Sequence, residues 1–326
     1  FYNRKVEKLK TCIQRCVLFI VIGLILYGGV YYTADRLAYK NGRLNSFHKV
    51  KTTKQSGFDY VILGASHALP FGFEDMNATL EGLTGTRIIN LAGPGHGIIP
   101  NILVFEYFLK YHQTKNVLYV LDTFALSSKK WNEERLEDVK LLQWAPFDLT
   151  LARMLLDYSF EKGINKKVPL DYITGFSKIN NHSRLEPETF DGEKKFGKKY
   201  RFFKPRDKQR IKYLYGSEKS DALFGTYMAI FMDWIETIKM NNIGVIVIKT
   251  PIPTHIYEML PQENEFNRKI QKVLMEEKIP FYDFSLLNNE KEFFYDTDHL
   301  NSKGVDEFFT NHLKDVLKRH AAPKKG

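Results

Sequence analysis

Cysteine is almost absent from this chain of 326 residues. Both cysteines, Cys12 and Cys16, precede residue 20, so neither a disulfide framework nor a cysteine-rich zinc module can organise the rest. A disordered chain is also excluded, because 44% of the residues are hydrophobic and 14% are aromatic. No repeat of fixed period is visible. The formal net charge of +10 indicates an anionic partner, but charge alone does not choose among nucleic acid, lipid and polymer.

Apart from tyrosine, residues 17–33 (VLFIVIGLILYGGVYYT) contain no ionisable side chain. Because roughly 20 apolar residues cross a hydrocarbon core, we predict a transmembrane anchor over residues 13–33. The basic tail before it, residues 1–12, is expected in the cytoplasm by the positive-inside rule, which leaves the rest of the chain extracytoplasmic. A cleavable signal peptide is the competing interpretation, but no small-x-small cleavage site follows the apolar run.

After the anchor, short apolar runs alternate with helical patterns, which predicts a parallel sheet covered on both faces. The expected strands are residues 58–63, 87–91, 117–121, 243–248 and 281–284. We therefore expect a three-layer α/β/α domain with a five-strand parallel sheet. Its predicted organisation is a juxtamembrane stalk (34–56), the domain itself (57–320) with an insertion at about 127–221, and a flexible tail (321–326).

The predicted insertion is strongly basic. Residues 161–220 hold sixteen Lys or Arg and eight Asp or Glu, and the densest part, residues 194–212, interleaves basic with aromatic side chains. Three interpretations remain open: a solvated face, a surface that docks on anionic headgroups or polymer phosphates, and a nucleic-acid site. An outward-facing anchored domain disfavours nucleic acid as a partner.

Polar residues follow the predicted strands at the edge where ligands bind in open α/β sheets. The first strand runs into GASH (64–67), which contains Ser66, and the second runs into the glycine turn NLAGPGHG (90–97). Near the C-terminus, YDTDHLNSKG (295–304) places Asp296 three residues before His299. That spacing lets the carboxylate accept a hydrogen bond from the imidazole Nδ1 and leaves Nε2 free as a base.

Each of these features has an ordinary alternative. Ser66 could be a helix cap, and the glycines could serve only a tight turn. Asp298 is a poorer candidate than Asp296 to orient the imidazole, because it adjoins His299 in the chain. A metal site is a further alternative, although no HExxH-like spacing supports it. Its ligands would come from His67, His96, Asp296, Asp298 and His299.

Together, in this order, the serine, the glycine turn and the Asp-x-x-His motif resemble the SGNH (GDSL-like) hydrolase and acyltransferase superfamily. The resemblance covers residues 58–126 and 243–318. It implies that Ser66 is the nucleophile, His299 the general base, Asp296 its orienting carboxylate and Gly95 an oxyanion N–H donor, with no cofactor and no metal.

One departure from the family pattern concerns the oxyanion hole. The family's Gly-x-Asn-Asp block after the third strand is replaced here by DTFALSS (122–128). Thr123 is therefore a candidate third donor; otherwise the hole depends on the backbone N–H groups of Ser66 and Gly95. We expect His67 to contact substrate or to pack, since it follows Ser66 directly and adjacent side chains point apart.

The predicted anchor narrows the resemblance. The combination is similar to the DltD-like proteins of teichoic-acid D-alanylation and to SGNH partners of membrane-bound O-acyltransferases that acetylate polysaccharides. It implies an extracytoplasmic serine acyltransferase or esterase acting on an acylated cell-envelope polymer, with a membrane-bound O-acyltransferase as partner. The alternative is a catalytically silent scaffold that binds anionic polymer or such a transferase.

Overall fold

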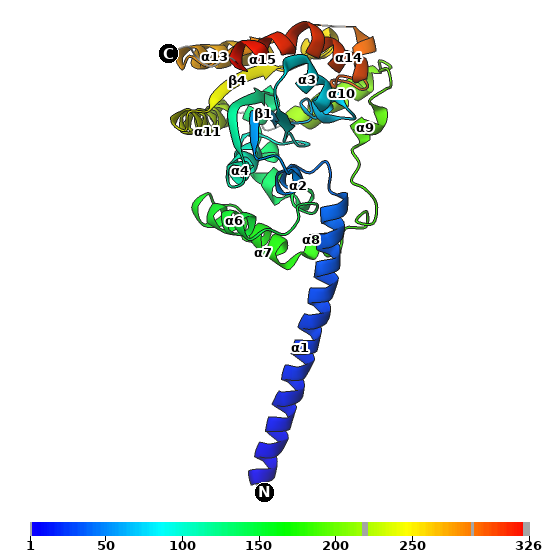
Figure 1. Ribbon diagram of the computed structural model, residues 1–326, viewed down its shortest axis with the longest axis vertical. Coiled ribbons are helices and arrows are strands. Elements are labelled where there is room, and N and C mark those ends of the chain that lie inside the picture. Colours follow the sequence, from blue (N-terminus) through cyan, green and yellow to red (C-terminus); the bar gives the residue numbers. More distant parts are fainter. Residues whose placement is uncertain (1, 217–220, 288–289, 322–326) are drawn as a thin grey trace.

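The structure is a computed structural model that describes residues 2–216, 221–287 and 290–321. Its centre is a five-stranded sheet in the order β2-β1-β3-β4-β5, in which every neighbouring pair is parallel (Figure 1). The predicted α/β fold with a five-strand parallel sheet is confirmed. The strands are β1 (Gly57–Gly64), β2 (Ile88–Asn90), β3 (Gln113–Val120), β4 (Gly244–Lys249) and β5 (Phe281–Asp283).

Alternation along the strands divides the core into two layers. In β1, Val61 and Leu63 face one hydrophobic cluster, whereas Tyr60 and Ile62 face the other. The first layer is covered chiefly by α4 (Ile98–Leu109), α11 (Asp221–Met240) and α13 (Glu263–Glu276). The second is covered by α3 (Met76–Thr84), α14 (Ser302–Phe308), the π-helical turn η6 (Phe309–Leu313) and α15 (Lys314–Ala321). Because both faces are covered, the strands are apolar on both sides.

The first helix, α1 (Tyr2–Asn41), projects from the body of the molecule and is long and apolar enough to cross a membrane (Figure 1). A signal sequence would meet the same criterion. The helix does not stop at the end of its apolar run, however. It continues into the domain, where Ala34 and Ala38 are buried and Asp35 forms an ion pair with Lys178 at 2.5 Å.

Residues 34–56, predicted to be a juxtamembrane stalk, are instead part of the folded domain. They comprise the end of α1 and a second helix, α2 (Ser46–Thr52), whose first turn is capped by the Asn45 side chain. Phe47 and Val50 of α2 are buried in the main core. Two buried apolar side chains do not give a recognisable pattern in a basic, polar segment, which is why the sequence predicted a stalk there.

The chain between β3 and α11, in which the insertion was predicted at about 127–221, is largely helical in its described part. It touches the C-terminal part of the domain, where the Tyr200 N–H donates to the Phe294 carbonyl at 2.7 Å. Its helices are η2 (Thr123–Leu126), η3 (Lys129–Trp131), α5 (Glu133–Glu137), η4 (Val139–Leu141), α6 (Leu149–Glu161), α7 (Lys167–Thr174), α8 (Phe176–Ile179), α9 (Asp191–Lys195) and α10 (Lys204–Tyr215).

Three short helices lie in the remaining loops: η1 (Leu69–Gly72), α12 (Thr254–Tyr257) and η5 (Lys291–Phe293). Beyond residue 321, the predicted C-terminal tail lies outside the described residues.

Candidate active site

Ser66 lies in the turn that follows β1. The strand ends at Gly64, where φ is +149° and a Cβ atom would lie 2.7 Å from the Val120 carbonyl oxygen, so the chain needs glycine to turn there. The Gly64 N–H is held by the Asn101 side-chain oxygen at 3.1 Å. The chain then enters η1, and the Ser66 hydroxyl oxygen lies 2.9 Å from His299 Nε2.

His299 is held by its own loop. Its Nδ1 lies 2.9 Å from each Asp296 carboxylate oxygen, and the His299 N–H donates to Asp296 Oδ1 at 3.0 Å. The Tyr295 ring stacks on the imidazole with 5.5 Å between ring centroids. With Nδ1 donating to Asp296, Nε2 is left as the acceptor that faces the Ser66 hydroxyl. The two segments, 233 residues apart, thus form a Ser-His-Asp chain of contacts.

Arg210 of α10 also reaches this group. Its Nε lies 3.0 and 2.9 Å from the two Asp298 oxygens, and its Nη2 lies 3.4 Å from His299 Nε2. Burial by itself lowers the pKa of Arg210, but the carboxylates of Asp298 and Asp296 raise it above its ordinary value. A fixed guanidinium from the basic insertion therefore lies beside the imidazole.

His67 does not line the cavity at Ser66; it is buried behind the Ser-His pair between two carboxylates. Its Nδ1 lies 2.5 Å from Asp122 Oδ1 and its Nε2 lies 3.1 Å from Asp298 Oδ2. Burial lowers the pKa of His67, but Asp122 and Asp298 raise it more, to about 10. His67 is therefore a cation at neutral pH, and both of its ring nitrogens face carboxylates rather than Ser66.

The two acids of the Asp-x-x-His motif differ in their surroundings. Asp298 has a side chain only 3% exposed, whereas that of Asp296 is 34% exposed. Burial raises the pKa of Asp298, but Arg210, His299 and His67 together bring it far below its usual range. Burial also raises the pKa of Asp296, but His299 reverses this and lowers it. Both carboxyls are ionised at neutral pH.

The ligand atoms of His67, Asp298 and His299 lie within 4.8 Å of one another, close enough for a metal ion. Each of these groups already has partners of its own. Asp298 binds the Arg210 guanidinium, and both His67 nitrogens face carboxylates. A metal ion would have to compete with Arg210 for the same oxygens, so the donor set suits an ion-pair network better than a metal site.

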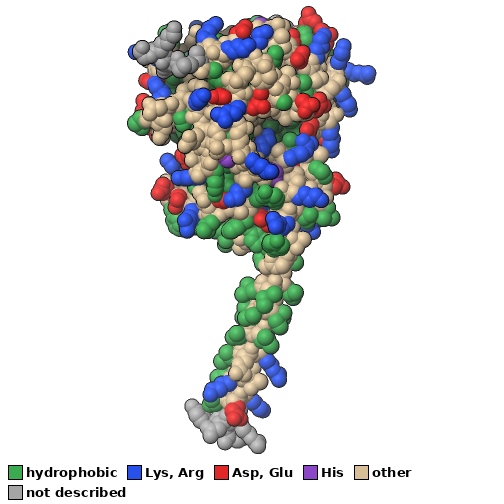
Figure 2. Space-filling model, viewed as in Figure 1, with side chains coloured by type: hydrophobic (Ala, Val, Ile, Leu, Met, Phe, Trp, Pro, Cys, Tyr) green, Lys and Arg blue, Asp and Glu red, His purple; other side chains and the backbone are tan. Residues whose placement is uncertain are grey.

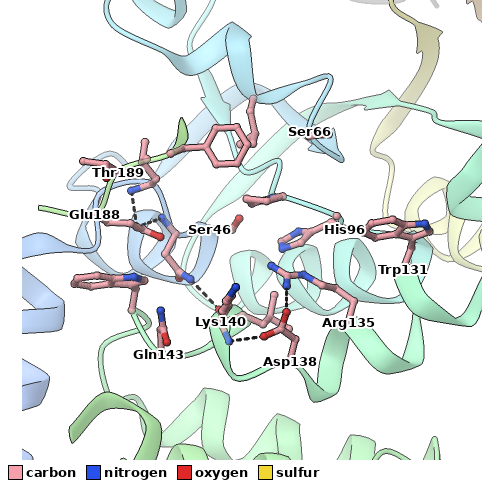
Figure 3. A pocket seen from close by; sticks show the side chains of 18 of the residues that line it. Ser46, Ser66, His96, Trp131, Arg135, Asp138, Lys140, Gln143, Glu188 and Thr189 are labelled. Carbon is pink, nitrogen blue, oxygen red and sulfur yellow. Dashed lines mark hydrogen bonds and ion pairs between the residues drawn. The ribbon is translucent and has the colours of Figure 1, made fainter. Parts of the chain in front are cut away.

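The Ser-His pair opens into a cavity of about 580 Å³. Figure 3 shows His96 beside Arg135, with Ser66 above them in the view and Asp138 and Lys140 below. Burial, assisted by Arg135, lowers the pKa of His96 well below its usual value, so this imidazole is neutral. Its Nδ1 is buried and has no hydrogen-bond partner among the described residues.

Gly95 lines the same cavity in a left-handed conformation, with φ at +67°. Within the described part of the chain, the N–H groups of Ser66 and Gly95 donate to no acceptor. The Thr123 hydroxyl, by contrast, donates to Glu263 Oε1 at 2.7 Å and lines a separate small cavity. Gly95 therefore lines the same cavity as Ser66, whereas Thr123 does not.

Sequence reasoning missed Arg210, and it named Asp122 only as the start of a loop. Asp122 follows β3, so its position at the ligand-binding edge was open to the same argument that selected Ser66. Arg210 gave no such signal, because it was one of many basic residues in an insertion. Only the tertiary fold brings it to Asp298, 88 residues away.

Comparisons with known proteins add little to this geometry. No known protein family matches the sequence, and no curated protein matches it either. Among solved structures, the fold is similar to that of an acylhydrolase candidate from Bacteroides fragilis, with a TM-score of 0.43 and 13% identity over 83% of this chain and 90% of that one. A similarity this low supports no conclusion about function, so the function proposed below is based on the site.

Proposed function

We propose that this protein is a serine-dependent acyl-transferring or ester-cleaving enzyme of the SGNH type. The observation that carries the proposal is the contact chain from Ser66 Oγ through His299 to Asp296, with 2.9 Å at both links, opening into a cavity. A serine activated by a base, with the base oriented by a third group, is the arrangement of nucleophilic acyl transfer. The expected SGNH resemblance names the same three residues for the same roles.

In the first step, Ser66 Oγ would attack an ester or thioester carbonyl while its proton passes to His299 Nε2. Asp296 stabilises the imidazolium that results. When the tetrahedral intermediate collapses, the leaving group takes that proton and an acyl-Ser66 ester remains. In the second step, His299 accepts a proton from water or from an acceptor hydroxyl, which attacks the ester; His299 then returns the proton to Ser66.

The oxyanion would be bound by the free N–H groups of Ser66 and Gly95. Arg210 adds a positive charge on the same side as His299 Nε2, and a fixed charge in a water-poor site favours a developing anion. This provides electrostatic stabilisation that the missing Asn block would otherwise supply. Thr123 has no part in this proposal.

An acylated, anionic cell-envelope polymer, a teichoic acid or polysaccharide, is the substrate class that fits best. Arg135 and Lys140 line the cavity beside the rings of Trp131 and Tyr213, and three acids, Asp138, Glu186 and Glu188, line it as well. Exposed bases continue along α10 outside it, including Lys204 and Lys208. Figure 2 shows Lys and Arg side chains around a hollow in this face of the body. A polymer that reaches the cavity would cross this basic surface.

We place the domain outside the cytoplasm, anchored through α1 with its N-terminus inside. Ala34 and Ala38, near the end of α1, are buried, so the domain packs against this helix. Cleavage after the apolar run would cut the helix just before these residues, which supports its retention. Outside the cytoplasm no acyl-CoA pool exists, so acyl transfer requires a membrane-bound O-acyltransferase to deliver the acyl group.

A fluorophosphonate probe tests the chemistry directly. The full chain in detergent should form a covalent adduct that Ser66→Ala abolishes and the control Ser302→Ala keeps. The refuting result is that circular dichroism shows both chains to be folded but the wild-type chain forms no adduct that depends on Ser66. The enzyme proposal then fails and a silent scaffold is favoured. Mass spectrometry of envelope polymers from strains with and without Ser66 would then identify both acyl group and acceptor.

A further inference from the structure

Three helices of the insertion, α6, α7 and α8, expose large apolar side chains. Phe160 is 73% exposed, Leu170 62% and Phe176 63%, and Leu149 and Ile173 are exposed too. Helices α6 and α7 bury other apolar residues in the core, so their exposed side chains are not required for packing. Single exposed apolar residues are ordinary, but their repetition on three consecutive helices indicates an interaction surface.

The anchor helix fixes where this surface lies. Tyr27, within the apolar run of α1, donates its hydroxyl to the Thr174 carbonyl at the end of α7 at 2.9 Å. Tyr31 contacts the Phe147 ring, with 6.1 Å between centroids. Figure 1 shows α6, α7 and α8 as the layer of the body from which α1 projects, and Figure 2 shows hydrophobic side chains at that edge.

Helix geometry then places the layer at the membrane. The apolar run of residues 17–33 is about 25 Å long at 1.5 Å per residue, shorter than a hydrocarbon core of about 30 Å. The whole run must therefore lie within the bilayer or its interface if α1 spans it. Because Thr174 is hydrogen-bonded to Tyr27, six residues before the end of that run, α7 cannot stand clear of the lipid.

Two further observations favour lipid as the occupant. A groove of about 370 Å³ lies between α1 and α8, lined mostly by apolar or small residues such as Ile25, Val30 and Ile179, with Arg184 also on its wall. Between α6 and α7 stand exposed lysines, and Lys166 Nζ lies 5.6 Å from the centre of the Phe160 ring. Apolar side chains flanked by lysines are the composition of helices that lie in a membrane interface.

We propose that α6, α7 and α8 form a membrane-docking platform whose apolar side chains lie in the interface of the bilayer that α1 spans. The proposal rests on the anchor but not on the chemistry at Ser66. It implies that the domain is held at a fixed height and tilt on the membrane rather than on a flexible stalk.

Depth-dependent quenching of a fluorophore tests the platform. In the full chain carrying Cys12→Ser and Cys16→Ser, single cysteines would replace Phe160, Leu170 or Phe176 and be labelled with an environment-sensitive dye. The protein would be reconstituted in discs of phosphatidylcholine and phosphatidylglycerol. Lipids with a nitroxide near the headgroup should lower the fluorescence at all three sites at least twofold.

Matched controls separate the platform from the anchor. Met240 and Leu286, also exposed, lie on other parts of the domain, and labels there should be unaffected by the nitroxide. A label at Ile22, inside α1, reports the span itself when the nitroxide is placed deep on the acyl chain. If Ile22 is quenched but the three platform sites are not, the platform is overturned and the anchor stands. The same result is expected if a membrane protein, absent from the discs, naturally covers this face. If Ile22 is not quenched, anchor and platform both fail.

Discussion

Asp296 and Asp298, two residues apart, should have separable roles. Asp296 holds His299 Nδ1 with both oxygens at 2.9 Å and is partly exposed. In Asp296→Asn the amide can present an N–H to Nδ1, which favours the wrong tautomer. We expect the rate of fluorophosphonate labelling to fall by roughly three to four orders of magnitude, as in other triads, with a change in stability below about 1 kcal/mol.

Asp298→Asn should instead act on stability. The carboxylate is almost fully buried and binds Arg210 at 2.9 Å and His67 at 3.1 Å, so its loss leaves His67 with Asp122 as its one contacting acid and removes the carboxylate that Arg210 contacts. Breaking a buried pair in this way costs about 3 to 5 kcal/mol. In a domain of this size that lowers Tm by about 6 to 15 °C. Labelling per folded molecule should fall less than about tenfold, because Asp298 is 3.4 Å from His299 Nδ1, too far for a strong hydrogen bond.

Labelling kinetics and thermal unfolding, both on the full chain in detergent, measure the two effects. Asp191→Asn, at a carboxylate 83% exposed, is the matched control and should change neither. The opposite pattern would refute the reasoning: if Asp298→Asn abolishes labelling at an unchanged Tm while Asp296→Asn labels normally, Asp298 orients the base.

Three further substitutions test neighbouring parts of the site. The pKa of His67 is raised from 6.5 to about 10 in the folded protein, so its contribution to stability is complete below about pH 6.5 and is lost as the pH rises through 10. The difference in Tm between wild type and His67→Gln should therefore narrow over that interval. A constant difference would contradict the ion pairs. Thr123→Val should lower the free energy of unfolding by about 1 to 3 kcal/mol, because the hydrogen bond to Glu263 is lost, and should leave labelling unchanged. Labelling that is a hundredfold slower would instead indicate that Thr123 is an oxyanion donor. Gly95→Ala puts a Cβ 2.7 Å from the Trp131 ring at positive φ and should slow labelling more than tenfold, while Gly82→Ala, with open space around it, should not; equal effects would argue against a specific role for Gly95.

The sheet could be predicted from sequence because buried parallel strands are continuous apolar runs. The central strand β1 was expected at 58–63 and spans Gly57–Gly64. β3 begins at Gln113, four residues before the predicted start, because its first residues are polar and pair with the beginning of β1. The rule that ligands bind at the carboxyl ends of strands drew attention to Ser66, and the SGNH resemblance implied that it would meet His299; the structure places the two side chains 2.9 Å apart.

The surroundings of that pair could not be predicted in the same way. Charge composition shows that a segment is basic, but it does not show which of its cations is buried. Arg210 becomes part of the site only because α10 lies against the loop that carries Asp298. Likewise, Ala34 and Ala38 are ordinary helix residues in the sequence, and the helix that covers them comes from the insertion more than a hundred residues later.

The insertion links the two proposals physically. It leaves the sheet after β3, at the edge where Ser66 and Asp122 lie, so its helices start beside the catalytic cavity. Its early helices, α6 to α8, contact the anchor, whereas its last one, α10, carries Arg210 to His299. Because one continuous segment makes both contacts, we expect a shift of the domain relative to α1 to alter the position of the Arg210 guanidinium. The reaction at Ser66 should therefore depend on membrane attachment through this segment, and a comparison of labelling rates in discs and in detergent would measure that dependence; equal rates would show that the two ends of the insertion act independently.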